Sequence, residues 1–337
     1  MRRLTLAEVE RLRGTPGRSL LLFITDRCPV GCAHCSVDSR RDSPTISDFA
    51  RFEAIVAGIC AQPGLSLVGI SGGEPFVERR GLTLAVDALV AAGKELALYT
   101  SGVWATPTVP RWIREVIRPA ACVFLSTDAF HAAAVAEERF VRAARTIAEE
   151  GVWLIVQVLR LPEMVARAER LLRAALGAGY QERAELSLIS PLPYGRGAAV
   201  FAPRERRPGA SFAACNSLAA PVVRYDGIVT ACCNERVITG HGPGRLRRRC
   251  ASAEELAAGL ADLRADPLLG VIGGLGGGAL TQHPRFADLA ERRFSSICEL
   301  CWASQQRART VEDHPDRLLA AMAMMGRETR EGAETVR

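Results

Sequence analysis

The sequence predicts an α/β fold with a parallel sheet, followed by a smaller unit of different composition. Three observations indicate this fold: six short apolar runs recur between residues 19 and 191, segments of helical length separate them, and polar motifs follow most of the runs. Strands that alternate with amphipathic helices are typical of parallel sheets. Right-handed crossovers curl such a series into a barrel or an open doubly wound sheet, and both bind ligands at the carboxyl ends of the strands.

Each apolar run is expected to form one strand. The runs are residues 19–24, 65–70, 95–100, 121–126, 152–159 and 184–189. Five segments between them, for example residues 131–150 and 162–178, carry Ala, Leu, Val and charged residues at helical spacing. Residues 1–18 precede the first strand as an N-terminal extension.

Polar residues follow five of the six expected strands. The motifs are Asp26 to Cys35, Ser71-Gly-Gly-Glu-Pro75, Thr100-Ser-Gly102, Ser126-Thr-Asp128 and residues 191–197. Because the carboxyl ends of parallel strands share one edge, we expect these motifs to converge on one rim.

The alternation stops after Gly197, and residues 198–310 are richer in Gly, Pro, Arg and Cys. A chain of 337 residues exceeds the usual size of a single core, so a second unit is expected there. The glycine-rich residues 270–279 are predicted to form a mobile loop. Within the C-terminal segment, residues 311–337, a short helix is expected over residues 314–325 and a frayed tail over residues 326–337.

Composition narrows the class of protein. With 48% hydrophobic residues but no apolar stretch long enough to cross a membrane, and with acids near the N-terminus, the sequence predicts a globular cytoplasmic protein that does not bind membranes. Eleven cysteines in such a chain favour metal binding or catalysis over disulfides. The basic runs at 204–207 and 245–249 lack interleaved aromatics, so no nucleic-acid partner is expected. These runs are expected to be solvated loops; the less favoured alternative is a patch that binds an acidic peptide or leader.

Cys28, Cys32 and Cys35 follow the first expected strand within one short loop. Three thiolates suit three corners of a cubane iron–sulfur cluster, whereas a structural zinc site normally takes four protein ligands. The spacing therefore predicts a cluster with one open iron; buried thiols or a zinc loop are the alternatives.

The CxxxCxxC spacing resembles the signature of the radical S-adenosylmethionine (SAM) superfamily, and Ser71-Gly-Gly-Glu-Pro75 is similar to that family's GGEP stretch. The resemblance implies a partial (β/α)6 TIM barrel over residues 19–197. It also implies a [4Fe–4S] cluster whose open iron binds the amino and carboxylate groups of SAM. An electron then breaks the S–C5′ bond, giving methionine and a 5′-deoxyadenosyl radical that takes a hydrogen atom from the substrate.

The resemblance also implies which residues contact SAM. Ser71, Gly72, Gly73, Glu74 and Pro75 would approach the SAM ammonium, with the glycines allowing close contact. The other implied contacts are His34 near the adenine, Thr100, Ser101, Ser126, Asp128, Gln157, Arg160, Tyr194 and Arg196. For Ser126 and Asp128, a capped helix start is an equal alternative. His131 is expected on a helix surface, with a substrate-facing acid or base as the alternative.

A second set of cysteines follows: Cys215, Cys232, Cys298 and Cys301, with Gly227 five residues before Cys232. Residues 224–231 are expected to form a hairpin with Asp-Gly at its turn. The pattern resembles the SPASM extension or its shortened twitch form, an α+β domain over residues 198–310. The resemblance implies one auxiliary [4Fe–4S] cluster held by four cysteines; a structural zinc site is the alternative.

Four cysteines lie outside both sets. Cys60 and Cys122 are expected in the core. Cys233 and Cys250 are also favoured as small buried residues, and the alternative is that one of them is catalytic and donates a hydrogen atom to a substrate radical, as in some peptide epimerases.

An auxiliary cluster that accepts an electron suits oxidative reactions. The resemblance implies an oxidoreductase that modifies a ribosomally synthesised peptide by crosslinking, oxidation or epimerisation, or a dehydrogenase of a small carbinol or aminosugar. The peptide is favoured because residues 234–297 could form a channel rimmed by Arg245, Arg247, Arg248 and Arg249. The expected partners are an external electron donor such as ferredoxin or flavodoxin and a separate leader-peptide recognition protein. The non-enzymatic alternative is an iron–sulfur electron carrier or a zinc-stabilised binding protein.

Overall fold

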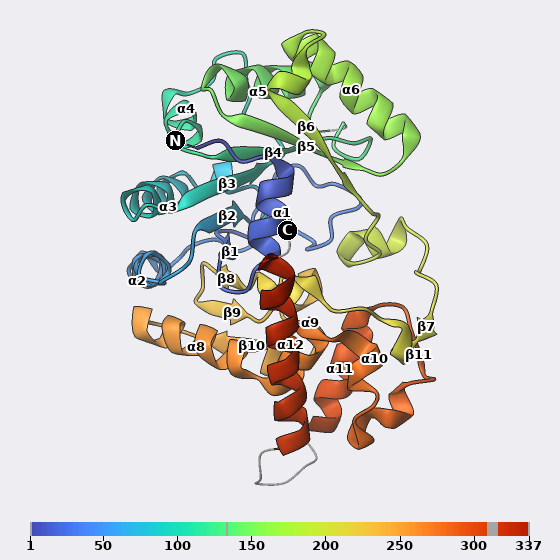
Figure 1. Ribbon diagram of the computed structural model, residues 1–337. Coiled ribbons are helices and arrows are strands. Elements are labelled where there is room, and N and C mark those ends of the chain that lie inside the picture. The colour runs from blue at the N-terminus through green and yellow to red at the C-terminus, as the bar shows by residue number, and fades with distance from the viewer. Residues whose placement is uncertain (1, 133, 309–315, 336–337) are drawn as a thin grey trace.

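A computed structural model describes residues 2–132, 134–308 and 316–335, and its central feature is a nine-stranded sheet in the order β10-β9-β8-β1-β2-β3-β4-β5-β6 (Figure 1). The strands are β1 (Ser19–Phe23), β2 (Leu67–Ser71), β3 (Glu95–Thr100), β4 (Cys122–Ser126), β5 (Trp153–Leu159), β6 (Ala184–Ile189), β8 (Val222–Arg224), β9 (Ile228–Thr230) and β10 (Arg247–Arg249). From β8 through β1 to β6 the neighbours are parallel, whereas β9 and β10 are antiparallel. The six strands expected from the sequence are confirmed, and the curved sheet is an open, partial barrel.

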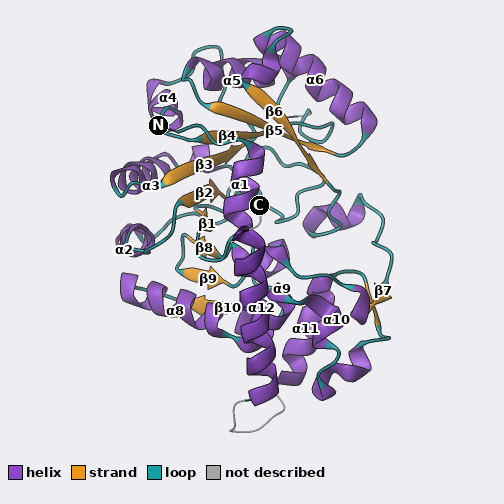
Figure 2. Ribbon diagram, viewed as in Figure 1, coloured by secondary structure: helices purple, strands orange, loops and turns teal. Residues whose placement is uncertain are grey.

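Five helices cover the outer face of this sheet (Figure 2). They are α2 (Phe49–Cys60), α3 (Arg79–Ala91), α4 (Arg111–Ile117), α5 (Glu137–Glu149) and α6 (Pro162–Leu176). Alternate strand residues such as Leu22, Ile70 and Leu98 pack with buried helix residues such as Ile55 and Leu82 in one large core. Side chains alternate across a strand, so the intervening residues face the inside of the barrel.

The N-terminal extension closes the amino end of the inner face. Helix α1 (Leu6–Gly14) begins with a capping box between Thr5 and Glu8. Its apolar residues Val9 and Leu12 pack against the barrel interior, for example against Phe124. Helix α1 therefore covers this part of the inner face, an arrangement that the sequence did not indicate.

The expected hairpin is confirmed as β8–β9, and it lies beside β1 in the main sheet. Gly227 sits in its turn with φ +82°, and a Cβ there would lie 2.1 Å from the carbonyl oxygen of Cys250. Both facts require glycine. After β10, helix α8 (Ala253–Ala265) packs on α2, where a Cβ on Gly58 would lie 2.9 Å from Ala253 Cα.

The prediction of a mobile loop over residues 270–279 is wrong. These residues belong to α9 (Pro267–Gly274) and α10 (Gly276–Leu280). Asp266 caps α9 by accepting a hydrogen bond from Leu269 N, and Pro267 occupies its first turn. The glycines allow close helix packing, because a Cβ on Gly274 would lie 2.3 Å from Gly326 O in the last helix.

The prediction of a frayed tail is also wrong for residues 326–335, and residues 336–337 lie outside the described residues. Helix α12 (Arg317–Thr335) continues through residues 326–335 and packs along α9. Part of the helix expected over residues 314–325 lies outside the described residues. The remaining elements are α7 (Glu235–Ile238), α11 (Ile297–Ala308) and the short antiparallel pair β7 (Arg207–Pro208) and β11 (Arg293–Phe294). In the described part of the chain, every helix is too short or too polar to cross a membrane.

Candidate active site

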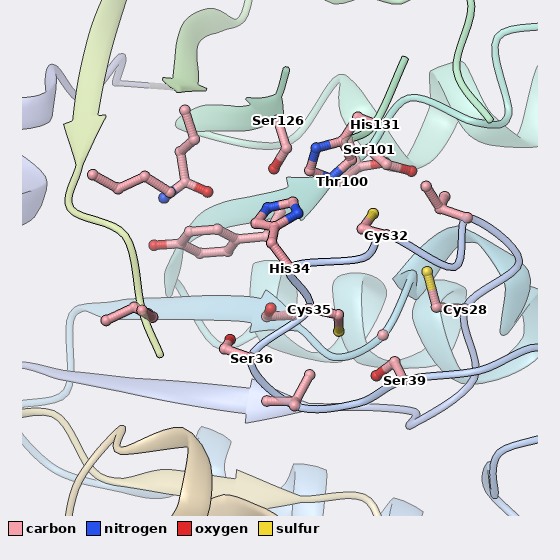
Figure 3. Close-up of a pocket in the computed structure, with 18 of the residues that line it drawn as sticks. Cys28, Cys32, His34, Cys35, Ser36, Ser39, Thr100, Ser101, Ser126 and His131 are labelled. Atoms are coloured by element: carbon pink, nitrogen blue, oxygen red, sulfur yellow. The ribbon is translucent and has the colours of Figure 1, made fainter. Parts of the chain in front are cut away.

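Three thiols from one loop line a pocket at the carboxyl ends of the parallel strands (Figure 3). Cys28, Cys32 and Cys35 all lie between β1 and α2. Eight further residues that the sequence predicted for this site line the same pocket: His34, Ser71, Gly72, Gly73, Thr100, Ser101, Ser126 and Gln157. The structure therefore brings together the polar ends of β1 to β5.

Arg196 holds the cysteine loop from outside the pocket. Its Nε donates to Cys32 O over 2.9 Å, and its backbone N–H donates to Cys35 O over 3.0 Å. Its guanidinium also pairs with Asp38 at 2.6 Å. The sequence suggested Arg196 as a SAM contact, but the structure places it as a clamp on the loop backbone.

The thiol of Cys28 resists ionisation when no metal is bound. Burial raises the pKa of Cys28 to about 12, and the neighbouring thiols of Cys32 and Cys35 contribute to this rise. Metals bind thiolates, so a cation at this site has to displace protons. Three convergent thiols in one pocket fit three ligands of a [4Fe–4S] cluster.

The two glycines after β2 allow the strand end to lie directly on the cysteine loop. Gly73 N donates to Thr25 O over 2.7 Å, and a Cβ on Gly73 would lie 2.3 Å from Arg27 O. Gly72 has φ +153°, and a Cβ there would lie 2.5 Å from Thr25 O. The glycines are therefore needed for backbone packing around the pocket, a requirement that the sequence did not reveal.

Glu74 is buried and lies outside the pocket lining. Its carboxylate accepts hydrogen bonds from Thr100 Oγ1 at 2.8 Å, Ser101 N at 2.8 Å and Ser101 Oγ at 2.5 Å. It also caps the short 3-10 helix that begins at Pro75, by accepting from Phe76 N. Burial raises the pKa of Glu74. The structure uses this carboxylate to connect the ends of β2 and β3, so its acceptor sites are occupied by protein groups and not directed to a SAM ammonium.

Asp128 lies behind the pocket between two histidines. Its Oδ2 is 3.2 Å from His34 Nε2, and its Oδ1 is 2.9 Å from His131 Nδ1. His34 also stacks against Phe130, with ring centroids 4.8 Å apart. His131 is not on a helix surface as expected, since α5 begins only at Glu137 and the imidazole lines the pocket.

This group offers ligand atoms that all lie within 4.8 Å of one another. The carboxylate of Asp128, however, already accepts hydrogen bonds from the backbone N–H groups of Phe130 and His131. Burial lowers the pKa of His131, but hydrogen bonds to Asp128 and Cys32 outweigh it and raise that pKa to about 10. These contacts describe a hydrogen-bonded network and not a metal site.

Two predicted contacts lie elsewhere. Arg160 is exposed and donates to Leu188 O, and Tyr194 lines a second pocket. Conversely, the sequence missed pocket residues that carry no motif, among them Tyr99 and Leu159. Tyr99 could have been found from strand alternation, because it lies two residues from Ala97 on the inner face of β3.

The second cysteine set also converges. Cys215 precedes a 3-10 helix, Cys232 follows β9, and Cys298 and Cys301 lie one turn apart at the start of α11. Burial raises the pKa of Cys298 to about 12, and the nearby thiol of Cys215 adds to this rise. The pKa of Cys301 is raised by burial and by the thiols of Cys298 and Cys215. Four neighbouring thiols supply the ligand number of a [4Fe–4S] cluster. Among the described residues they do not form a group with all ligand atoms within 4.8 Å of one another, the close spacing that a single zinc ion needs.

A second pocket lies beside these thiols. Its lining includes Cys298, Cys233 and Asn234, and Asn234 Nδ2 donates to Cys298 Sγ over 3.3 Å. Leu192 lines both this pocket and the first one. The first cysteine set and Cys298 of the second set therefore face adjoining cavities.

The remaining cysteines differ in position. Cys233 lines the second pocket, whereas Cys250 is buried against α8 and donates to Glu255 O over 3.3 Å. The structure thus gives Cys250 a packing position away from both pockets. Cys122 is fully buried, and Cys60 is half-buried on α2.

The arginines expected to rim a channel do not line either pocket. Arg247, Arg248 and Arg249 form β10 at the edge of the sheet. Arg248 pairs with Asp262, and Arg245 lies 3.6 Å from Asp266. These arginines are therefore engaged within their own part of the fold.

Residues 22–174 match the family model of the radical SAM superfamily. They form a radical SAM domain. This domain extends from β1 almost to the end of α6 and contains all three cysteines of the first set, and the family implies SAM and a [4Fe–4S] cluster.

The chain is also similar to individual proteins of known sequence or structure. A GTP 3′,8-cyclase from Moorella thermoacetica is 32% identical over 88 residues, which is 25% of this chain and 27% of that protein. The chain thus spans about a quarter of that relative. A structure of anSMEcpe with bound AdoMet has a TM-score of 0.52 at 13% identity and covers 94% of this chain and 97% of its own. SuiB of Streptococcus suis bound to S-adenosylmethionine has a TM-score of 0.48 at 14% identity. The match covers 79% of this chain and 70% of the SuiB chain. The anSMEcpe likeness supports the fold over nearly the whole chain.

Proposed function

We propose that this chain is an enzyme that reductively cleaves SAM with a [4Fe–4S] cluster on Cys28, Cys32 and Cys35. The observation that carries the proposal is the convergence of these three thiols with the Gly72–Gly73 backbone in one pocket of the radical SAM domain. Such a cluster, when reduced by one electron and bound to SAM, supplies a 5′-deoxyadenosyl radical that abstracts a hydrogen atom from a substrate.

The residues of the chain prepare this pocket for SAM. Arg196 and the glycine turn hold the loop backbone, and Glu74 fixes the ends of β2 and β3. Ser126 ends β4, and Gln157 is its register partner on β5. Both present polar side chains to the cavity, where they are available to bind the ribose or the carboxylate of SAM.

We further propose that Cys215, Cys232, Cys298 and Cys301 hold an auxiliary [4Fe–4S] cluster of the SPASM or twitch type. Four thiols would complete its coordination, so it would exchange electrons and not bind substrate. The adjoining second pocket supports transfer of an electron from a substrate radical to this cluster.

The favoured substrate is a residue of a ribosomally synthesised peptide, which would be oxidised, crosslinked or epimerised. The second pocket, of about 600 Å³, is larger than the first, of about 230 Å³, and its lining carries both signs of charge. Arg204, Arg207, Glu205 and Glu235 all contribute to it. A large polar cavity that adjoins the thiol pocket suits an extended chain with varied side chains better than one small ring. Dehydrogenation of a small carbinol or aminosugar is the second candidate.

The proposal also implies partners. An external one-electron donor such as ferredoxin or flavodoxin would reduce the first cluster. A separate leader-peptide recognition protein would present the peptide.

Reconstitution under anaerobic conditions tests the central proposal. The protein is loaded with iron and sulfide and incubated with dithionite and SAM, and 5′-deoxyadenosine is measured by mass spectrometry. Formation of this nucleoside is expected. A loaded sample that forms none would favour an electron carrier, and zinc without iron at the first thiol set would favour a binding protein.

A further inference from the structure

A third cavity, of about 490 Å³, lies at the opposite end of the sheet from the first thiol set. The turn before β1, the hairpin β8–β9 and the helices α8, α9 and α12 contribute its lining. Arg18 and Pro221 line the cavity and directly precede the parallel strands β1 and β8, whereas Cys28 follows β1. The cavity is therefore at the amino ends of these strands, apart from the SAM pocket at their carboxyl ends.

The interior of this cavity is aliphatic. Leu260 and Leu263 of α8 and Leu269 of α9 line it, and they are buried residues. Among the described residues, the lining contains no aromatic side chain, and its one neutral polar side chain is the hydroxyl of Thr15. An aromatic ring would find no ring to stack on, and the hydroxyl groups of a sugar or nucleotide would find few side-chain partners. The lining therefore fits an aliphatic chain.

Three arginines supply the charge of this cavity. Arg18, Arg264 and Arg327 line it and are exposed, which places their guanidinium groups at its opening. Within the described part of the chain, none of these three guanidinium groups has a hydrogen bond or an ion pair, and no acidic residue joins them in the lining. A Cβ on Gly17 would lie 3.9 Å from Arg264 Cζ, so the guanidinium of Arg264 lies against the turn that carries Arg18. The opening is therefore positively charged and lacks counter-ions.

An apolar interior behind a positive opening is complementary to an amphipathic anion. The aliphatic part of such a molecule gains free energy when it leaves water for the interior. Its anionic group stays at the opening, where a guanidinium can donate two parallel hydrogen bonds to a carboxylate or a phosphate. A neutral or cationic head group would leave the three arginines without a partner. The volume also lies within the range of small-molecule sites, about 300–1,000 Å³.

We propose that this cavity binds a small amphipathic anion, whose aliphatic chain lies among the leucines of α8 and α9. Its terminal carboxylate or phosphate is held by Arg18, Arg264 and Arg327 at the opening. This site is additional to the proposed reaction, because the lining contains none of the thiols of either set and none of the expected SAM contacts. Binding there can be measured whether or not the protein cleaves SAM.

The test is isothermal titration calorimetry of the anaerobically loaded full chain with octanoate. Octan-1-ol has the same chain length without the charge, acetate has the charge without the chain, and octyl phosphate distinguishes the two anionic groups. The variants are Arg264→Gln and Arg18→Gln, which remove one charge each. Arg183→Gln is the matched control, because Arg183 is exposed, lies outside this cavity and, among the described residues, has no side-chain hydrogen bond or ion pair.

Octanoate should bind at a single saturable site, and both octan-1-ol and acetate should bind about tenfold more weakly or less. Arg264→Gln and Arg18→Gln should each weaken octanoate binding by about threefold to tenfold, and Arg183→Gln should match the unsubstituted protein. Tighter binding of octyl phosphate than of octanoate would support the site and assign a phosphate, and the reverse order would assign a carboxylate. Unchanged octanoate affinity in both variants would overturn the inference, and so would equal binding of octanoate and octan-1-ol.

Two further outcomes would also overturn the inference. One is the absence of saturable binding of both octanoate and octyl phosphate to the unsubstituted protein, a result that needs no variant to fold. The other is a dimer, detected by analytical ultracentrifugation, that Arg264→Gln dissociates, because the cavity would then be an interface between two copies of this chain. Neither outcome bears on SAM cleavage, so the proposed function would stand or fall separately, by the formation of 5′-deoxyadenosine.

Discussion

Asp26, two residues before Cys28, forms a bidentate pair with Arg224 at the end of β8. Arg224 Nη1 donates to Asp26 Oδ1 over 3.0 Å, and Nη2 donates to Oδ2 over 2.8 Å. Tyr225 Oη adds a third hydrogen bond of 2.8 Å to the same carboxylate. The hairpin of the C-terminal part thus fixes the start of the cysteine loop.

Replacement of Arg224 should destabilise the whole chain. Arg224→Gln leaves the Asp26 carboxylate with Tyr225 as its main partner, and breaking a mostly buried ion pair costs about 3 kcal/mol or more. The free energy of unfolding, measured by urea denaturation and circular dichroism, should fall by that amount. Arg111→Gln is the control, because the Arg111 side chain is 91% exposed and its pair with Glu115 contributes at most about 0.5 kcal/mol. Equal stability of the two variants would contradict a role for the Asp26 pair.

A single methyl group at Gly274 should disturb the packing of α9 on α12. Its Cβ would lie 2.3 Å from backbone oxygen of Gly326, which cannot rotate away. Gly274→Ala should therefore lower the free energy of unfolding by about 1–3 kcal/mol. Gly14→Ala adds the same group where no heavy atom lies within 4 Å, and it should be neutral or stabilise by up to about 1 kcal/mol. A neutral Gly274→Ala would show that this helix contact is loose in solution.

Loss of one cysteine in the first set should abolish SAM cleavage. Cys28→Ala removes one of three thiols in the pocket, and a cubane with fewer protein ligands is not held. Formation of 5′-deoxyadenosine should fall to the background of the apoprotein. Cys60→Ser is the control: Cys60 lies on α2 outside the pocket, so the variant should retain cleavage. Cleavage by Cys28→Ala protein at the normal rate would exclude this loop as the cluster site.

Loss of a cysteine in the second set should separate cleavage from turnover. Cys298→Ala should reduce the iron content by about four atoms per chain if an auxiliary [4Fe–4S] cluster is present. Some SAM cleavage should remain, whereas the modified product should be lost. Iron and zinc are measured together by plasma mass spectrometry. Full product formation in this variant would show that the second cysteine set takes no part in the reaction. Loss of zinc in place of iron would identify the second set as a structural zinc site.

The sequence predicted what depends on local pattern. The strands near Leu22, Ile70 and Leu98 follow from apolar runs, and the turn at Gly227 follows from the Asp-Gly pair. The pocket lining from five strand ends follows from parallel topology. These features need no knowledge of which distant residues meet.

What the sequence did not predict depends on distant partners. The glycines of α9 suggested a loop, because the helix that covers them lies some fifty residues later and supplies Gly326 at the contact. Glu74 and Arg196 were expected to contact SAM. Their hydrogen-bond partners are instead protein groups that lie far away in the sequence and that the fold brings near. His131 was expected on a helix surface, since nothing in the local pattern indicated that the loop before α5 places this side chain in the pocket lining.

The pairing of β8 with β1 has a consequence for where this chain can be cut. Composition changes after residue 197, yet β1 takes its second neighbour from residues 222–224. A fragment that ended at residue 197 would expose the hydrogen-bonding edge of the strand that carries the cysteine loop, and unprotected strand edges invite self-association. Expression of the barrel as an independent module should therefore yield aggregates, and any trimming of this protein has to retain the hairpin.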